Sequence, residues 1–286
     1  MVVSSGRENL KPGLFPETGE IMTLMLLSWN VNGLRACYDR KHFLPVFRHN
    51  PGIVCVQETK APAEKLPEKV RDLYGYHTYF SEVQPGSTAG VGLFTREKPV
   101  SVTFGFGDPV FDNKGRVLVA DYGSFVLLNV YFPLGIKPMG NLDNKLKFYD
   151  AFLTYIRHIA EKHRPVIVCG DFNVAHTDND LYNPPKKPVR QIGISPDERQ
   201  RIDHLVDLGF ADTFRMFHKD AGHYTRWPFQ NNSRKRNFGW RLDYFFVNEP
   251  VRPHVLDAAI LSEYLGSDHC PVMLEVDLPG TGIARQ

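Results

Sequence analysis

Carboxylate, amide and imidazole side chains stand next to short apolar runs at five places along the chain. They are Asn30, Asn32, Glu58, Asp171, Asn173, Asp243, Asp268 and His269. Taken singly, such a residue more often caps a turn, because Asp and Asn side chains bond readily to nearby backbone groups. Five such places in one chain are harder to explain as turns alone, and we treat them as a candidate active site.

The residue types in this set suit the hydrolysis of a phosphodiester. A hard cation such as Mg²⁺, with Mn²⁺ as a substitute, needs one or two carboxylates and completes its shell with water and phosphate oxygens; Glu58 is the first candidate ligand. A general base contributes about 10²–10⁴-fold, roughly 3–5 kcal/mol, whereas enzymes lower barriers by about 8–23 kcal/mol. Electrostatic stabilisation must therefore supply most of the rate, which favours a cation, a charged histidine and amide donors acting together.

Mixed strands and helices are expected to position these residues. Apolar runs predict about eight strands, at residues 23–29, 52–57, 89–94, 116–122, 125–132, 165–172, 242–247 and 271–276. Apolar residues at three- and four-residue intervals between Leu142 and Lys162 predict an amphipathic helix. A second helix is predicted after the N-cap Ser195 and the following Pro196, ending at Gly209. This mixture indicates an α/β protein.

Length and composition suit one large globular domain. The chain has 286 residues, of which 42% are hydrophobic and 23% charged, and single cores stop growing near ~250–300 residues. We expect a catalytic domain over residues 22–279, between a flexible tail at 1–21 and a short C-terminal tail at 280–286. Two compact halves that share one core are the alternative.

Charge, hydropathy and cysteine spacing limit the partners and the location. With 34 Lys and Arg against 32 Asp and Glu, the net charge of +2 predicts no global basic field, so any nucleic-acid-binding surface must be local. The sequence shows neither a membrane span nor a secretory signal, which favours the cytoplasm or nucleoid of a prokaryote or the nucleus of a eukaryote. The four cysteines lack metal-binding spacing and are expected to be reduced and mostly buried.

Six motifs carry a resemblance to a known family: SWNVNGLRA, QETK, VYFP, GDFNVAH, GWRLDYFFVN and GSDHCP. In this order they resemble the motifs of the exonuclease III family, from Thr23 to Val276. GDFN and SDH alone would fit any member of the wider superfamily, whereas SWNVNGLRA and GWRLDYFFVN are typical of apurinic/apyrimidinic (AP) endonucleases. The resemblance implies a four-layered α/β sandwich, in which two mixed β-sheets pack face to face between layers of helices.

The resemblance also implies roles for the residues of the candidate site. The metal would be bound by Glu58, with Asn30, Asn32 and Asp268 near it. The groups that act on the phosphate would be Asp171 as the base, His269 as a donor that Asp243 orients, and Tyr131 and Asn173 as phosphate contacts.

Substrate contacts follow from the same resemblance. Trp240 and Leu242 would form an apolar wall for a base-less deoxyribose, and the remaining DNA contacts would be Arg226, Trp227, Lys137 and Arg35. Three positions, Thr88, Leu134 and Arg226, depart from residues that commonly grip the substrate in this family. These departures leave the lesion preference open. Lys137 and Arg226 are candidates to supply the phosphate contacts that the usual residues would make.

The expected activity is incision of double-stranded DNA 5′ to abasic sites by a monomer, which leaves a 3′-hydroxyl and a 5′-deoxyribose phosphate. Removal of 3′-blocking groups and 3′–5′ exonuclease activity are further expectations. Three alternatives are a nuclease redirected to other damaged nucleotides, a phosphatase of small phosphoesters, and a DNA-binding module without catalysis. The presence of Glu58, Asp171, Asp243 and His269 argues against the last.

Overall fold

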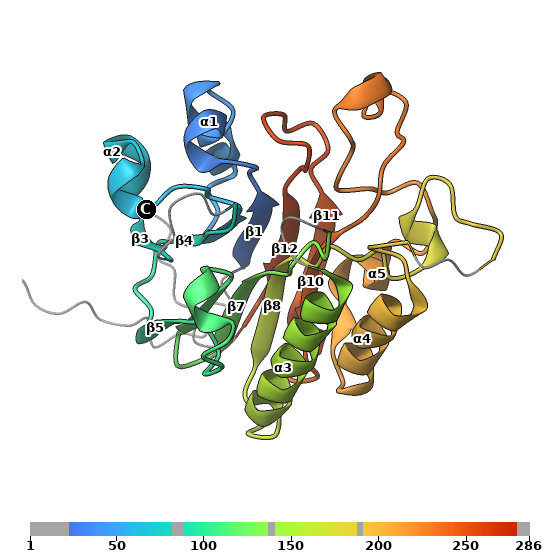
Figure 1. Ribbon diagram of the computed structural model, residues 1–286. Helices are drawn as coiled ribbons and strands as arrows, with labels where there is room; N and C mark the ends of the chain where they lie inside the picture. Colours follow the sequence, from blue (N-terminus) through green and yellow to red (C-terminus); the bar gives the residue numbers. More distant parts are fainter. Residues whose placement is uncertain (1–22, 82–87, 137–140, 188–190, 279–286) are drawn as a thin grey trace, which may run out of the picture.

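The computed structural model describes residues 23–81, 88–136, 141–187 and 191–278, which form two six-stranded sheets (Figure 1). In spatial order, the first sheet contains β11 (Val255–Ile260), β12 (Val272–Val276), β1 (Leu24–Asn30), β2 (Ile53–Gln57), β4 (Val91–Thr95) and β3 (His77–Phe80). The second contains β5 (Ser101–Phe104), β6 (Val117–Asp121), β7 (Val126–Tyr131), β8 (Val166–Asp171), β10 (Asp243–Val247) and β9 (Ala211–Asp212). Both sheets are mixed, because β1 pairs with β2 and β7 with β8 in parallel, whereas the other neighbours are antiparallel.

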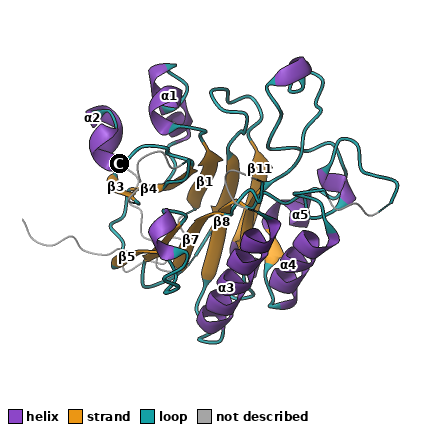
Figure 2. Cartoon of the chain, viewed as in Figure 1, coloured by secondary structure: helices purple, strands orange, loops and turns teal. Residues whose placement is uncertain are grey.

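Helices cover the outer faces of both sheets (Figure 2). The first sheet is covered by α1 (Leu34–Asp39), the 3₁₀ helix η1 (Leu44–His49) and α2 (Glu68–Arg71), and the short 3₁₀ helix η2 (Ala63–Lys65) precedes α2. The second is covered by α3 (Leu142–Ala160) and α4 (Pro196–Asp207), which lie side by side. The shorter elements are α5 (Thr213–Phe217), η3 (Asp112–Lys114), η4 (Asp178–Asp180), η5 (Gln230–Asn232) and η6 (Arg252–His254).

Alternating side chains of the strands build three apolar layers. Leu26 points into the core between the two sheets, whereas its neighbour Leu27 packs toward α1 and η1. In the same way, Cys169 faces the first sheet and Val168 packs with Phe152 of α3. Successive residues of a strand point to opposite faces, so a continuous apolar run is what a strand buried on both faces requires. The predicted four-layered sandwich is confirmed.

Strand direction brings the polar residues to one end of the sandwich. Asn30 ends β1, and Tyr131 and Asp171 lie in register at the ends of the parallel strands β7 and β8. Asp243 begins the antiparallel strand β10 opposite Asp171. His269 stands shortly before β12, which runs antiparallel to β1 and therefore begins at the same end. Residues far apart in the sequence thus meet at one edge.

All eight predicted strands are present, but the described residues contain four more. These are β3, β5, β9 and β11, the edge strands of the two sheets. Their side chains are largely intermediate or exposed. An edge strand is open to solvent on one side, so it does not need the continuous apolar run by which the central strands were found.

Both predicted helices are confirmed. The first ends at Ala160 rather than Lys162, and the second begins at Pro196, where Ser195 and Glu198 form a capping box. The four cysteines are free and buried. No helix in the described ranges is both long and apolar enough to cross a membrane. The predicted tails at 1–21 and 280–286 lie outside the described residues.

Candidate active site

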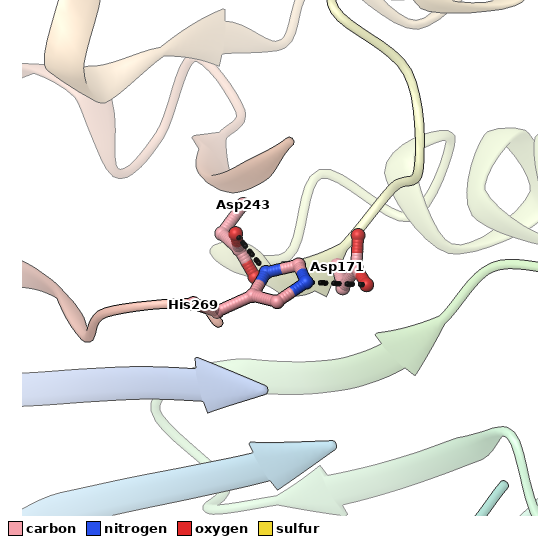
Figure 3. Close-up of side chains that lie close together, drawn as sticks. All are labelled: Asp171, Asp243 and His269. Carbon is pink, nitrogen blue, oxygen red and sulfur yellow. Dashed lines mark hydrogen bonds and ion pairs between the residues drawn. The ribbon is translucent and has the colours of Figure 1, made fainter. Parts of the chain in front are cut away.

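The centre of the site is a histidine held between two aspartates (Figure 3). His269 Nδ1 is 2.8 Å from Asp243 Oδ2, and His269 Nε2 is 4.0 Å from Asp171 Oδ2. The Thr225 hydroxyl donates to the same Asp243 oxygen at 2.6 Å and accepts the backbone N–H of Leu242 at 3.0 Å. These contacts are buried, so Asp243 holds the imidazole with Nε2 directed toward Asp171.

The charges around the histidine decide its protonation. Burial lowers the pKa of His269, but the neighbouring carboxylates of Asp243 and Asp171 outweigh it and raise the pKa to about 10. Burial and the negative charge of Asp243 raise the pKa of Asp171 to about 7. At neutral pH, His269 is therefore an imidazolium that can donate a hydrogen bond or a proton. Asp171 exchanges its proton in the same pH range, because its pKa is about 7. A protonated histidine beside a carboxylate that can accept a proton is an arrangement that suits acid–base catalysis.

Two asparagine amides connect the histidine and its aspartates to the other acids. Asn30 Nδ2 donates to Asp171 Oδ2 at 2.8 Å and to Glu58 Oε1 at 2.9 Å. Asn32 Nδ2 donates to Asp268 Oδ1 at 2.7 Å. Glu58 has a φ angle of 55°, a left-handed conformation that is uncommon for a glutamate and often found at functional sites, and Asn32, a residue type that adopts it more readily, has a φ of 47°. The predicted metal ligands therefore converge.

The oxygens of this cluster already accept a cation. The Lys60 ammonium is 2.8 Å from Glu58 Oε2 and also donates to the Asn32 carboxamide oxygen. Carboxylate and carboxamide oxygens are also the donors that hard divalent ions prefer. The oxygens around Glu58 therefore fit a divalent cation, which would replace the Lys60 ammonium as their positively charged partner.

A second acidic group could hold a metal by distance alone. Within the described ranges, ligand atoms of Asp171, Asp243 and His269 lie within 4.8 Å of one another. The His269 imidazole in this group is already bonded to Asp243, however, and hard divalent ions such as Mg²⁺ prefer oxygen ligands. The group around Glu58 is therefore the better candidate metal centre.

Tyr131 and Asn173 lie beside the acids. Burial and the negative charges of Glu58 and Asp171 hold the pKa of Tyr131 well above its usual range, so the phenol remains a hydrogen-bond donor. The Asn173 backbone N–H donates to Asp171 Oδ1 at 2.8 Å, and Asn173 Nδ2 donates to the Phe132 carbonyl at 3.0 Å. Both predicted phosphate contacts thus lie within the same cluster as the candidate base.

A buried ion pair supports this side of the site. Lys145 Nζ donates to Glu198 Oε1 at 2.6 Å and to the Asn173 carbonyl at 2.7 Å, and both side chains are fully buried. Glu198 Oε2 also accepts the backbone N–H of Gly193 at 2.8 Å. The pair therefore ties α3 and α4 to Asn173 and to the segment around Gly193. Sequence reasoning missed it, because the two partners are far apart in the chain.

A cavity of about 680 Å³ opens beside the acids and His269. Its apolar lining consists of Leu134, Ile136, Ile192, Trp240 and Leu242. Arg226 and Thr88 also line it, together with Glu58 and Asp268. The three positions that depart from the family pattern therefore all border this cavity. A second cavity of about 480 Å³, beside Tyr38 and Arg48 on the outer helices, contains none of the predicted site residues.

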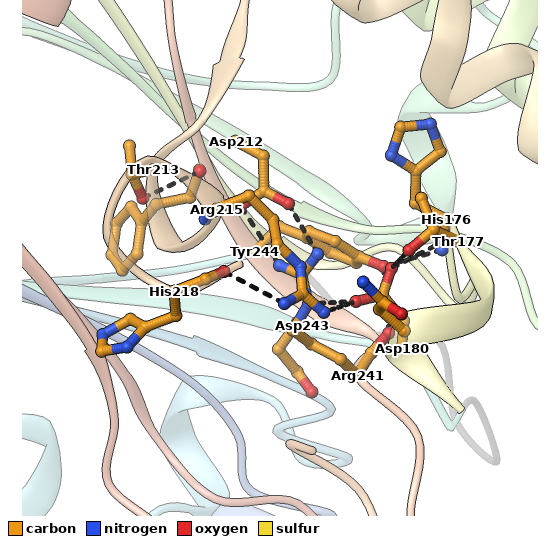
Figure 4. A network of polar contacts seen from close by, with 12 residues as sticks. His176, Thr177, Asp180, Asp212, Thr213, Arg215, His218, Arg241, Asp243 and Tyr244 are labelled. Carbon is orange, nitrogen blue, oxygen red and sulfur yellow. Dashed lines mark hydrogen bonds and ion pairs between the residues drawn. The ribbon is translucent and has the colours of Figure 1, made fainter. Parts of the chain in front are cut away.

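A buried network of charges surrounds Arg241, two residues before Asp243 in the chain (Figure 4). Arg241 Nε donates to Asp180 Oδ1 at 2.7 Å, and Arg241 Nη2 donates to Asp212 Oδ2 at 2.6 Å. Arg215 donates to the same oxygen of Asp180 at 2.5 Å. Arg241 is 1% exposed, so the ion pairs with these aspartates offset the cost of burying its positive charge. The GWRLDYFFVN motif contained this residue, but nothing in the sequence identified its partners.

Other predicted substrate contacts lie elsewhere. Trp227 is buried against Tyr224 and Cys270, and its Nε1 donates to Asn237 rather than facing the cavity. Arg35 is an exposed residue of α1 and does not line the cavity. Lys137 lies outside the described residues. The DNA contacts of these three residues stay predictions.

Comparisons with known proteins agree with this architecture. Residues 27–269 match the Endonuclease/Exonuclease/phosphatase family. The chain is 40% identical over 252 residues to recombination repair protein 1 of Drosophila melanogaster, which covers 88% of this chain but 37% of that protein. It is 35% identical over 257 residues to an exodeoxyribonuclease of Bacillus subtilis, with 89% and 100% of the two chains covered. A solved AP endonuclease from Archaeoglobus fulgidus superposes with a TM-score of 0.80 at 27% identity, with 89% and 100% covered.

Proposed function

Since the chain belongs to the Endonuclease/Exonuclease/phosphatase family, we propose that it is a DNA repair hydrolase that cuts the backbone of double-stranded DNA 5′ to abasic sites. The observation that carries this proposal is the convergence of Asp171, His269, Glu58 and Asp268 beside a cavity with an apolar wall. The relatives include proteins named exodeoxyribonuclease and AP endonuclease, which supports the same activity. We further propose that residues 22–279 act as one catalytic unit and that the protein works as a monomer.

We propose that Glu58 and Asp268, with Asn30 and Asn32 beside them, hold Mg²⁺, for which Mn²⁺ can substitute. The contact of the Lys60 ammonium with Glu58 and Asn32 supports this assignment. When bound, such a cation offsets the negative charge of the scissile phosphate and of its transition state.

The residues around the phosphate divide the remaining work. Asp171 takes a proton from the attacking water, since its raised pKa of about 7 makes it a stronger base than an ordinary carboxylate. His269 stabilises the charge that develops on the phosphate oxygens, and Asp243 keeps it protonated and oriented. Tyr131 and Asn173 hold the phosphate in position as hydrogen-bond donors.

The apolar wall provides the lesion preference in this proposal. Trp240 and Leu242 offer a surface for the deoxyribose, and an intact base must be expelled from the duplex before its sugar can reach the acids. Flipping costs a few kcal/mol and least at damaged positions, so an abasic site enters most easily. A phosphatase of small phosphoesters has less support, because the GWRLDYFFVN segment that bears this wall is typical of AP endonucleases.

The test is incision of a duplex that contains one synthetic abasic site, with Mg²⁺ and with a chelator, by the wild type and by Asp171→Asn. Mg²⁺-dependent cutting on the 5′ side, lost in the variant, is the expected result. No cutting by folded wild-type protein would contradict the proposal. Damaged bases, 3′-blocked ends and small phosphoesters would then be assayed next.

A further inference from the structure

The two halves of the candidate active site belong to different sheets. Asn30 ends β1 and Glu58 follows β2 in the first sheet, whereas Tyr131 and Asp171 end β7 and β8 in the second. The Asn30 amide joins the halves, because it donates to Glu58 Oε1 at 2.9 Å and to Asp171 Oδ2 at 2.8 Å. The geometry of the site therefore depends on how the two sheets are aligned.

Asn129 lies in the core between the two sheets, one layer further from the site than Tyr131. It precedes Tyr131 by two residues in β7, so its side chain points to the same face of the strand as Leu127 and Tyr131, which pack between the sheets. The side chain is fully buried among residues that are mostly aliphatic. A carboxamide in such surroundings costs free energy unless its polar atoms are hydrogen-bonded.

The carboxamide of Asn129 is bonded to the opposite sheet through both of its polar atoms. Its Nδ2 donates to the backbone carbonyl oxygens of Gly92 at 2.9 Å and of Val56 at 3.2 Å. Its Oδ1 accepts a hydrogen bond from Gln57 Nε2 at 2.8 Å. One side chain of the second sheet is thus attached to the adjacent strands β2 and β4 of the first. The attachment lies directly beside Glu58, the residue that follows Gln57.

We propose that Asn129 is a positioning residue whose three hydrogen bonds align the two sheets and thereby place Glu58 relative to Asp171. Apolar packing between sheets is non-directional and tolerates small shifts, whereas a hydrogen bond weakens steeply when it is bent. A misplacement of about 1 Å can slow an enzyme by ~10²-fold. The catalytic consequence of this inference rests on the proposed hydrolase activity, whereas the alignment itself does not.

A role in stability alone must be separable from a role in positioning. If Asn129 only stabilised the fold, protein that remains folded after its loss would work at the wild-type rate. If it aligns the sheets, the folded protein itself is slower. Leu128→Ala is the matched control, because Leu128 is the next residue of β7, is fully buried and packs on the opposite face, in the layer that contains α3. Its truncation leaves a cavity but does not remove the bonds between the sheets.

The experiment compares Asn129→Leu, the double variant Gln57→Leu with Asn129→Leu, and Leu128→Ala with the wild type. Leucine is close to asparagine in size and removes all three hydrogen bonds. The double variant also replaces their polar partner on the Gln57 side chain, which should restore part of the stability without restoring the attachment. For each protein we would measure Tm, the affinity for a duplex with one tetrahydrofuran abasic site, and the Mg²⁺-supported single-turnover rate well below Tm. A crystal structure of the double variant reports the distances from Asn30 Nδ2 to Glu58 and Asp171.

Both variants that lack Asn129 should cut about tenfold to a hundredfold more slowly with unchanged affinity for DNA. Leu128→Ala should lower Tm but keep the wild-type rate. In the crystal structure, Asn30 Nδ2 should no longer lie within hydrogen-bonding distance of both acids.

Three results would overturn the inference: a wild-type rate in the folded double variant, an equal loss of rate in Leu128→Ala, or unchanged distances from Asn30 Nδ2 to both acids. Wild-type protein that leaves the abasic duplex intact would instead overturn the proposed hydrolase activity. The crystal structure would still test the alignment of the sheets in that case.

Discussion

Replacing Arg241 by methionine should destabilise the protein strongly, although the residue touches no substrate. The guanidinium is 1% exposed and pairs with Asp180 and Asp212, whose side chains are 0% and 8% exposed. Asp180 would keep Arg215, but Asp212 would lose its two bonds to Arg241 and remain a buried charge. Removing one partner of a buried pair costs about 3–5 kcal/mol. At ~2–4 °C per kcal/mol for a domain of this size, Tm should fall by roughly 6–20 °C.

The assay is urea and thermal unfolding followed by tryptophan fluorescence, with two controls. Arg201→Met removes a guanidinium whose partner Asp150 is 54% exposed, and such pairs contribute at most about 1 kcal/mol. Adding Asp212→Asn to Arg241→Met removes the uncompensated charge and should recover part of the loss. If Arg241→Met destabilised the protein no more than Arg201→Met, the argument from buried charge would be refuted.

Three further predictions concern the centre of the site. Asp171→Asn should reduce abasic incision by about 10²–10⁴-fold or more, because a general base contributes that much; a smaller loss in a gel assay would contradict the assignment. Asp243→Asn should move the alkaline limit of activity to lower pH: burial lowers the pKa of His269, and Asp243 is the largest influence that raises it to about 10, so the proton is lost earlier without it. An unmoved pH profile would mean that the charge of His269 is not required. Gly170→Ala should destabilise by roughly 1–3 kcal/mol or more in thermal unfolding, because its Cβ would lie 1.8 Å from the Val130 carbonyl oxygen. An unchanged Tm would show that β7 and β8 separate easily.

The central strands and the two long helices could be predicted from the sequence because their buried residues form recognisable local patterns. Strands buried on both faces need continuous apolar runs, and α3 shows the spacing of a helix with one buried face. The edge strands carry no such pattern. In β11, for example, most side chains are partly or fully exposed, so the strand can be recognised only by its hydrogen-bonded pairing with β12. Local periodicity reports burial, and edge strands are held by pairing instead.

The types of the site residues were also readable, because carboxylate, amide and imidazole groups recur next to apolar runs at five places in the chain. Their mutual arrangement was not. The position of Asn30 Nδ2 between Glu58 and Asp171, or of His269 between two aspartates, depends on strand register and on side-chain orientation. The charge of His269 follows from burial next to carboxylates that are distant in the chain.

Supporting contacts depended on the tertiary structure most of all. Lys145 and Glu198 read as ordinary charges of surface helices, yet both are fully buried and hold the Asn173 carbonyl and the Gly193 N–H. Local sequence patterns specify which chemical groups the protein has and which central strands carry them. Only the folded chain decided which groups are desolvated and paired, because burial and electrostatic coupling depend on distances in space rather than along the sequence.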